Sequence, residues 1–209
     1  MQIGERGITI RKLGGDRAGE LRITRFLRNE KVTAEEMFAH AGQETAARVP
    51  GYEVVALQDT TSLREDGSGQ SIQAHVMLAV EAETGASLGL AHGQLLTRAG
   101  GKAAQRRNLT FDAKESRRWL DGVEAAAGLR EAGARGVTVV GDRESDIYTV
   151  FANRPASVEL VIRAAQDRAL CEGGRLFAKL AAAPRAGSFQ LAIPAAPGRQ
   201  ARTAQVELR

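Results

Sequence analysis

Two short apolar runs rich in β-branched residues, each followed closely by an aspartate, constrain the fold of this chain most. The runs are residues 54–57 (VVAL), which precede Asp59, and residues 137–140 (VTVV), which precede Asp142. Turn-forming residues bound both runs, and this pattern is typical of buried strands. An ionised carboxylate beside an apolar core is costly unless a positive group lies against it. If the two strands are neighbours, their aspartates would form a site for a divalent cation.

Composition limits the class of protein. The 209 residues, 43% of them hydrophobic, suffice for a core in one or two domains, and an aromatic content of 4% makes that core aliphatic. The net charge of +4 favours a polyanion as partner. A single cysteine, Cys171, excludes an intramolecular disulfide and favours a reducing compartment. No apolar segment has the length of a membrane span and no signal peptide is recognisable, so we expect a cytoplasmic protein without a membrane partner.

The predicted helices and strands follow the order of a mixed α/β sheet. Thr33 is the predicted N-cap of a helix that follows a short basic amphipathic element at residues 17–29. Thr84 and Gly85 form the predicted turn of a hairpin. Strands are predicted at residues 52–57, 71–82, 87–96, 137–141, 158–163, 189–193 and 203–208, and helices at 33–48, 114–132 and 176–182. A hairpin followed by strand–helix–strand units predicts an α/β fold whose sheet has mixed strand direction.

Several short strings of the sequence, in the same order, match motifs of one protein family. They are ITRFLRNEKV (residues 23–32), ALQDTTSL (56–63), KESRRWL (114–120), GDRESDIY (141–148) and LVIR (160–163). In these strings the chain resembles bacterial insertion-sequence transposases of the DDE class, in particular the cut-and-paste group that excises DNA through hairpin ends. The resemblance covers nearly the whole chain.

The resemblance implies a fold and a chemistry. The fold would be a ribonuclease H-like mixed sheet with flanking helices, preceded by a short N-terminal helical DNA-binding element and followed by a partial C-terminal β insertion. These parts would span residues 51–165, 1–50 and 166–209, respectively. Asp59 and Asp142 would be catalytic residues that hold Mg²⁺, with Mn²⁺ as a substitute, for two-metal phosphoryl transfer at transposon ends. The protein would be cytoplasmic and nucleoid-associated.

One catalytic acid of the family has no counterpart in the sequence. The family's third metal ligand is a glutamate on a later helix, and residues 143–209 resemble only the segments that precede that helix. We therefore interpret the chain as a truncated transposase, which we expect to be inactive alone. Its expected partners are double-stranded DNA and either a second copy of itself or a full-length transposase.

Basic residues are candidates for contacts with the DNA backbone, because such contacts need charge rather than a specific sequence. Arg143 and Arg163 could bind phosphate bidentately, or could form salt bridges with nearby acids. The basic loop at residues 98–108 could contact DNA or be solvated. The candidates are Arg25, Arg28, Lys102, Arg106, Arg107, Arg143 and Arg163.

The acidic residues also have simpler interpretations. Asp59 could form a turn with Thr60 and Thr61. Glu144 and Asp146 could cap the following helix or replace the missing carboxylate. Two other functions stay open, namely a non-catalytic DNA-binding remnant that occupies transposon ends and an α/β phosphohydrolase that uses Asp59 as its nucleophile. The phosphohydrolase is disfavoured because such phosphatases have a second aspartate where this chain has Thr61.

The remaining chemistry-bearing residues favour structural roles. His40, His75 and His92 are scattered without metal-ligand spacing, so we expect them to be hydrogen-bonded structural residues. Trp119 is predicted to anchor its helix in the core. Cys171 has no companion His or Asp and is not a candidate nucleophile.

Overall fold

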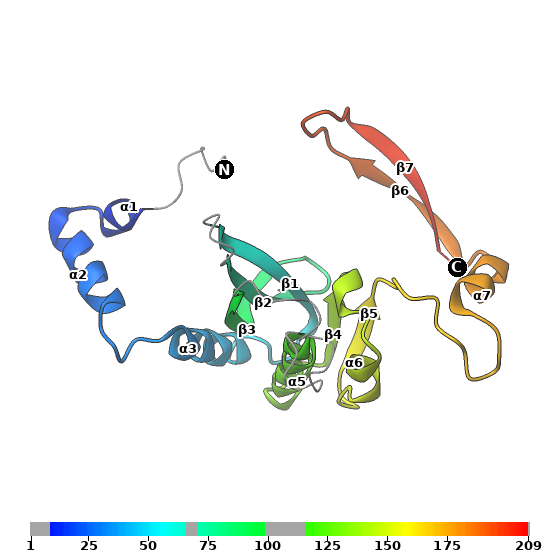
Figure 1. Ribbon diagram of the computed structural model, residues 1–209, viewed down its shortest axis with the longest axis horizontal. Coiled ribbons are helices and arrows are strands. Elements are labelled where there is room, and N and C mark those ends of the chain that lie inside the picture. The colour runs from blue at the N-terminus through cyan, green and yellow to red at the C-terminus, as the bar shows by residue number, and fades with distance from the viewer. Residues whose placement is uncertain (1–8, 66–70, 99–115, 209) are drawn as a thin grey trace. The chain divides into compact units, whose positions relative to one another are not determined.

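The computed structural model describes residues 9–65, 71–98 and 116–208. The chain forms two compact units, Met1–Arg163 and Ala164–Arg209 (Figure 1). The predicted DNA contacts Lys102, Arg106 and Arg107 lie outside the described residues.

The first unit is built on a five-stranded sheet. Its strands are β1 (Glu53–Glu65), β2 (Ser71–Glu81), β3 (Ser87–Arg98), β4 (Gly136–Gly141) and β5 (Glu159–Ile162). The strand order is β3-β2-β1-β4-β5. The neighbours β1, β2 and β3 pair antiparallel, whereas β4 pairs parallel with both β1 and β5. The predicted α/β fold with a mixed sheet and flanking helices is therefore confirmed at this level.

Strand alternation sends one set of side chains toward the helix α5 (Arg117–Glu131), which packs on the sheet (Figure 1). Val54 and Ala56 of β1 and Val137 and Val139 of β4 all belong to this buried set. The helix contributes Trp119, Leu120, Val123, Ala126 and Leu129 to the same core. Trp119 is therefore a core anchor, as predicted.

The helix α3 (Ala34–Ala46) packs along β3, the last strand on its side of the described sheet. The Thr33 hydroxyl accepts a hydrogen bond from the backbone N–H of Glu36 at 3.2 Å, which confirms Thr33 as the N-cap. The approach of the two elements depends on Gly93, because a Cβ atom there would lie 2.3 Å from the ring of Phe38. Glycine at this position thus lets the helix lie close to the strand.

β1 is longer than the apolar run predicts. The prediction ended the strand at Leu57, whereas β1 continues to Glu65. Its second half is held by the antiparallel partner β2, with Thr60 opposite His75 and Thr61 opposite Ala74. The predicted turn at Thr60 and Thr61 is therefore wrong, because cross-strand pairing keeps these polar residues extended.

Two helices precede α3. The helix α1 (Ile10–Gly14), which the sequence did not predict, is capped by Thr9, and α2 (Arg17–Leu27) is capped by the Asp16 carboxylate, which accepts from the N–H of Gly19 at 2.6 Å. A Cβ atom on Gly19 would lie 2.0 Å from the carbonyl oxygen of Gly14, so the two helices approach through glycines. The predicted basic amphipathic element corresponds to α2.

After β4, a short 3₁₀ helix (Arg143–Ser145) and α6 (Tyr148–Ala152) lead to β5. The second unit contains α7 (Leu176–Ala182) and an antiparallel hairpin of β6 (Gly187–Ile193) and β7 (Arg202–Leu208). Its helix and both strands lie where the sequence predicts them. Across the described parts of the chain, none of the helices combines the length and the hydropathy of a membrane span.

Candidate metal centre

The three parallel strands bring Asp59, Asp142 and Arg163 into one row. Gln58 of β1 pairs with Gly141 of β4, which in turn pairs with Ile162 of β5. Asp59 is the next residue of β1, whereas Asp142 and Arg163 directly follow the last residues of β4 and β5, and the N–H of Arg163 still donates to the carbonyl of Gly141 at 3.2 Å. Because neighbouring strands lie about 4.8 Å apart, the backbones of Gln58 and Gly141, which precede the two aspartates, are adjacent.

Asp59 belongs to the face of the sheet opposite α5, and Asp142 directly follows the last residue of β4. Gln58 and Gly141, the residues before them, point toward this helix, since a Cβ atom on Gly141 would lie 3.8 Å from the Trp119 ring and Gln58 contacts Gly122. Successive residues of a strand point to opposite faces, and Asp142 has an extended backbone with ψ of −171°. The carboxylates of Asp59 and Asp142 are accordingly exposed.

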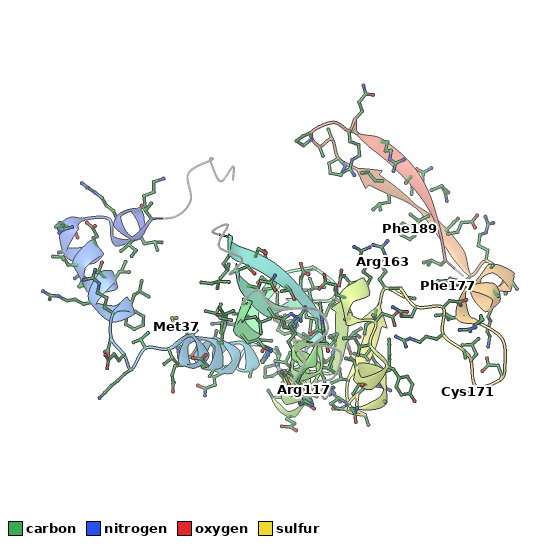
Figure 2. All side chains as sticks on the ribbon, in the orientation of Figure 1. Met37, Arg117, Arg163, Cys171, Phe177 and Phe189 are labelled. Atoms are coloured by element: carbon green, nitrogen blue, oxygen red, sulfur yellow. The ribbon has the colours of Figure 1, made fainter. Side chains whose placement is uncertain are left out.

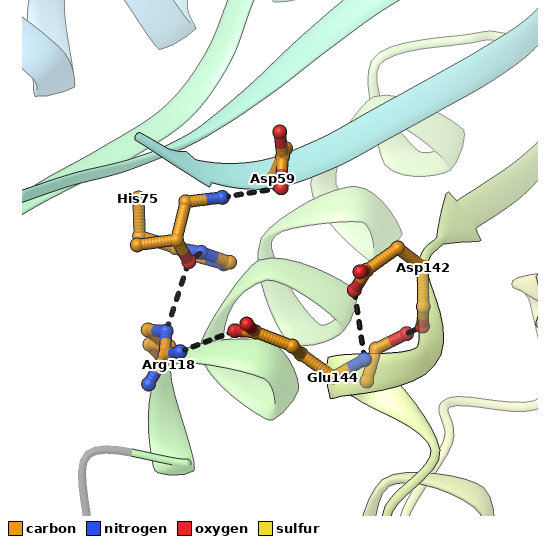
Figure 3. Close-up of polar contacts among 7 residues, drawn as sticks. Asp59, His75, Arg118, Asp142 and Glu144 are labelled. Carbon is orange, nitrogen blue, oxygen red and sulfur yellow. Dashed lines mark hydrogen bonds and ion pairs between the residues drawn. The ribbon is translucent and has the colours of Figure 1, made fainter. Parts of the chain in front are cut away.

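A backbone N–H group holds one oxygen of each carboxylate. The N–H of Thr60 donates to Asp59 Oδ1 and the N–H of Glu144 donates to Asp142 Oδ1, both at 2.8 Å (Figure 3). Asp142 thereby also caps the 3₁₀ helix that follows it. Within residues 9–65, 71–98 and 116–208, neither carboxylate forms an ion pair. With respect to the described residues, each therefore keeps its second oxygen available to a cation.

The nearby acids Glu144 and Asp146 are engaged elsewhere. Glu144 Oε2 lies 3.3 Å from Nη2 of Arg118, and Asp146 is buried and has other partners. Among the described residues, no three His, Cys, Asp or Glu side chains are grouped closely enough to hold a metal ion. The structure thus gives no support to Glu144 or Asp146 as a replacement for the third ligand.

The sequence did not predict a polar network that connects α5 to β1 and β2, next to Asp59 in the sequence. Arg118 Nε donates to Thr60 Oγ at 3.1 Å, and the same hydroxyl lies 2.9 Å from His75 Nδ1. The His75 ring packs edge-on against Trp119, with 4.6 Å between the ring centroids. Arg118 stands in one of the motif strings, yet nothing in its spacing indicates that its side chain reaches β1. The hydrogen bond of His75 confirms its structural role.

Burial and the neighbouring Arg118 guanidinium lower the pKa of His75 from 6.5 to about 4. The ring is therefore neutral at pH 7. The Thr60 hydroxyl thus lies between the Arg118 guanidinium, from which it accepts, and Nδ1 of the His75 ring. Burial also lowers the pKa of His92.

The predicted DNA contacts that the structure describes are all exposed. Arg163 lies at the end of β5 (Figure 2), Arg143 lies in the turn after Asp142, and Arg25 and Arg28 lie at the C-terminal end of α2. The alternative interpretation assigned Arg143 and Arg163 to salt bridges, but neither forms one with any described residue. Of the two, Arg163 shares the row of the aspartates.

The donor set at this row suits a hard divalent cation. Mg²⁺ prefers oxygen ligands and is commonly held by one or two carboxylates, with waters and substrate phosphates completing its octahedral shell. Asp59 on β1 and Asp142 directly after β4 supply two exposed carboxylates, and Arg163 directly after β5 supplies an exposed positive group that suits a phosphate. No protein-family model matches this chain, and a search of curated proteins finds no match.

Proposed function

We propose that this chain is related to the DDE-class transposases, and that Asp59 and Asp142 together bind Mg²⁺ for phosphoryl transfer on double-stranded DNA. One observation carries the proposal: Asp59 and Asp142, both exposed, directly follow Gln58 and Gly141, the last pair of the parallel ladder between β1 and β4. The strand order β3-β2-β1-β4-β5 is compatible with a ribonuclease H-like fold and supports the same conclusion.

The residues of the row have distinct roles in this proposal. Asp59 and Asp142 would hold the cation, and the backbone N–H of Thr60 and of Glu144, respectively, orients each carboxylate. Arg163 binds a non-bridging phosphate oxygen and aligns the DNA backbone with the carboxylates. When bound, Mg²⁺ supplies activation of the attacking water or 3′-hydroxyl and stabilises the leaving oxygen.

A specific observation favours a second candidate, a non-catalytic DNA-binding transposase remnant. Two carboxylates are available at the row, and Glu144, two residues after Asp142, is paired with Arg118. A site with two carboxylates binds a cation but controls two cations poorly, so we expect cleavage of supercoiled DNA with Mg²⁺ to be very slow or absent. The exposed arginines of α2 would still bind duplex DNA.

Calorimetric titration with Mn²⁺ tests the metal site. We expect the wild-type protein to bind Mn²⁺, and Asp59→Asn and Asp142→Asn each to lower the affinity at least about tenfold, because each removes a charged ligand without changing the side-chain shape. Glu131→Gln is the control, since it removes the same charge from an exposed position at the end of α5. Equal affinities in all four proteins would contradict the proposed function.

A further inference from the structure

One guanidinium group joins the two segments that carry the aspartates. Arg118 lies in the first turn of α5, and 6% of its side chain is exposed. Its Nε donates to the hydroxyl of Thr60 at 3.1 Å, and its Nη2 donates to the carboxylate of Glu144 at 3.3 Å (Figure 3). Thr60 directly follows Asp59 on β1, and Glu144 lies in the turn that follows Asp142.

The contacts continue to both carboxylates in the same way. On each side, the residue whose side chain binds Arg118 is also the residue whose backbone N–H binds the aspartate, at 2.8 Å in both cases. We propose that Arg118 is a positioning residue, which holds the carboxylates of Asp59 and Asp142 in the relative orientation that lets them bind one cation. This inference rests on the proposed function.

The position of Arg118 explains why such a connection is needed. The parallel ladder between β1 and β4 ends at the pair Gln58–Gly141, just before the two aspartates. Beyond this last pair, the described part of the chain has no backbone hydrogen bond between β1 and the segment after β4. At this point the Arg118 side chain connects β1 to the turn after β4, through its hydrogen bonds to Thr60 and Glu144. These side-chain hydrogen bonds replace the backbone pairing that has ended.

The surroundings of Arg118 hold the guanidinium in one orientation. It lies over the Trp119 ring, with 5.3 Å from its central carbon to the ring centroid, and Trp119 is itself buried. The Thr60 hydroxyl is fixed from its other side by His75 Nδ1. A planar guanidinium has divergent N–H donors that reach two acceptors at once, whereas the compact ammonium of lysine does not match this geometry.

Three variants test the inference: Arg118→Gln, Arg118→Lys and the charge-matched control Arg135→Gln, which alters an exposed ion pair with Glu53 at the other end of the strands. For Arg118→Gln we expect Mn²⁺ affinity, measured by calorimetry, to fall about 10- to 100-fold, as for other residues that orient metal ligands. Arg118→Lys should recover part of this loss, and Arg135→Gln should bind like the wild type.

Nuclear magnetic resonance gives a readout that is independent of the metal. Arg118→Gln should shift the amide resonances of Thr60 and Glu144, and long-range ¹⁵N–¹H spectra should show a changed tautomer population of His75, while Arg135→Gln leaves these signals unchanged. If the wild type and Asp142→Asn bind Mn²⁺ equally weakly, the proposed function fails. Unshifted amides of Thr60 and Glu144 in Arg118→Gln would overturn the positioning role by itself.

A milder pair of variants covers the case in which Arg118→Gln does not fold. Thr60→Val removes the hydroxyl without changing the net charge or the side-chain shape, and Thr60→Ser keeps the hydroxyl. We expect Thr60→Val to weaken Mn²⁺ binding about tenfold and Thr60→Ser to bind like the wild type. Wild-type affinity in a folded Arg118→Gln, or in Thr60→Val, would overturn the inference.

Discussion

The carboxylates of Asp59 and Asp142 differ from those of Glu144 and Asp146 in their charged neighbours. Among the described residues, the first two accept hydrogen bonds from backbone N–H groups and form no ion pair, whereas Glu144 is paired with the Arg118 guanidinium. A carboxylate neutralised by a guanidinium attracts a cation weakly. An exposed carboxylate with a free oxygen can give up solvent to bind one. Asp59 and Asp142 are therefore better candidate cation ligands than Glu144.

The lowered pKa of a single residue, His75, makes the free energy of unfolding depend on pH. Its pKa is about 4 in the folded protein, where Arg118, His92 and Asp121 also act on it, against 6.5 when unfolded. The unfolded chain therefore binds a proton first as the pH falls below 6.5, so the free energy of unfolding decreases through the window down to about pH 4. We expect His75 to cost about 2 kcal/mol of stability between pH 7 and pH 5.

Urea denaturation of the wild type and His75→Gln at both pH values measures this contribution. Removal of the titrating ring should make the loss of stability between the two pH values smaller in His75→Gln. His40→Gln, at an exposed position of α3, is the control and should keep the wild-type dependence. The account of His75 fails if His75→Gln shows the same loss as the wild type.

β1 is the element that connects the two halves of the sheet. Its first half pairs with β2 on one side and with β4 on the other, while its second half continues with β2 alone. Asp59 lies at the point where the parallel partner ends. Asp59 is therefore in the middle of a long strand and yet just beyond the end of the parallel ladder between β1 and β4. The turn that carries Asp142 begins at the same end of this ladder.

The sequence could predict part of this element and not the rest. The apolar run before Asp59 identifies the buried first half of β1, because β-branched residues and burial are visible in the residue pattern. The polar second half, with Thr60 and Thr61, has no such signal, since it is a strand through its pairing with β2. Likewise, no local pattern indicates that Arg118 reaches Thr60, because that hydrogen bond depends on how α5 packs on the sheet.

At the same scale, α2 provides a test of DNA binding. Arg25 and Arg28 are exposed at its C-terminal end, and each phosphate that an arginine neutralises releases counterions from the duplex. We expect the double variant Arg25→Gln/Arg28→Gln to bind duplex DNA more weakly than the wild type. The slope of log affinity against log salt concentration should also become shallower, by about 0.9 for each phosphate that the variant no longer neutralises.

Arg17 of the same helix provides the matched control, because it forms an ion pair with Glu20 at 2.9 Å. Arg17→Gln should change the salt slope less than the double variant does. Fluorescence anisotropy with a labelled duplex over a range of salt concentrations gives both values. A wild-type slope in the double variant would exclude Arg25 and Arg28 from the DNA-binding surface.

On the scale of the whole molecule, the strand order of the sheet in the first unit brings together segments that are far apart in the sequence. β1 is central in the order β3-β2-β1-β4-β5, and its parallel neighbour β4 comes from a part of the sequence far from it. The hairpin and the strand–helix–strand units made a mixed sheet predictable, and in that sheet Asp59 and Asp142 each follow one residue of the pair Gln58–Gly141. The register, which adds Arg163 to the row, depends on which residues of β1, β4 and β5 pair, and the sequence alone does not determine this pairing.

Anomalous diffraction from crystals soaked in Mn²⁺ shows directly whether Asp59 and Asp142 jointly hold a divalent cation. We expect one strong peak at the row of the two aspartates, with carboxylate oxygens of both about 2.1 Å from it, and no such peak in crystals of Asp142→Asn. A peak that contacts neither aspartate, or wild-type crystals without a peak at this row, would contradict this expectation.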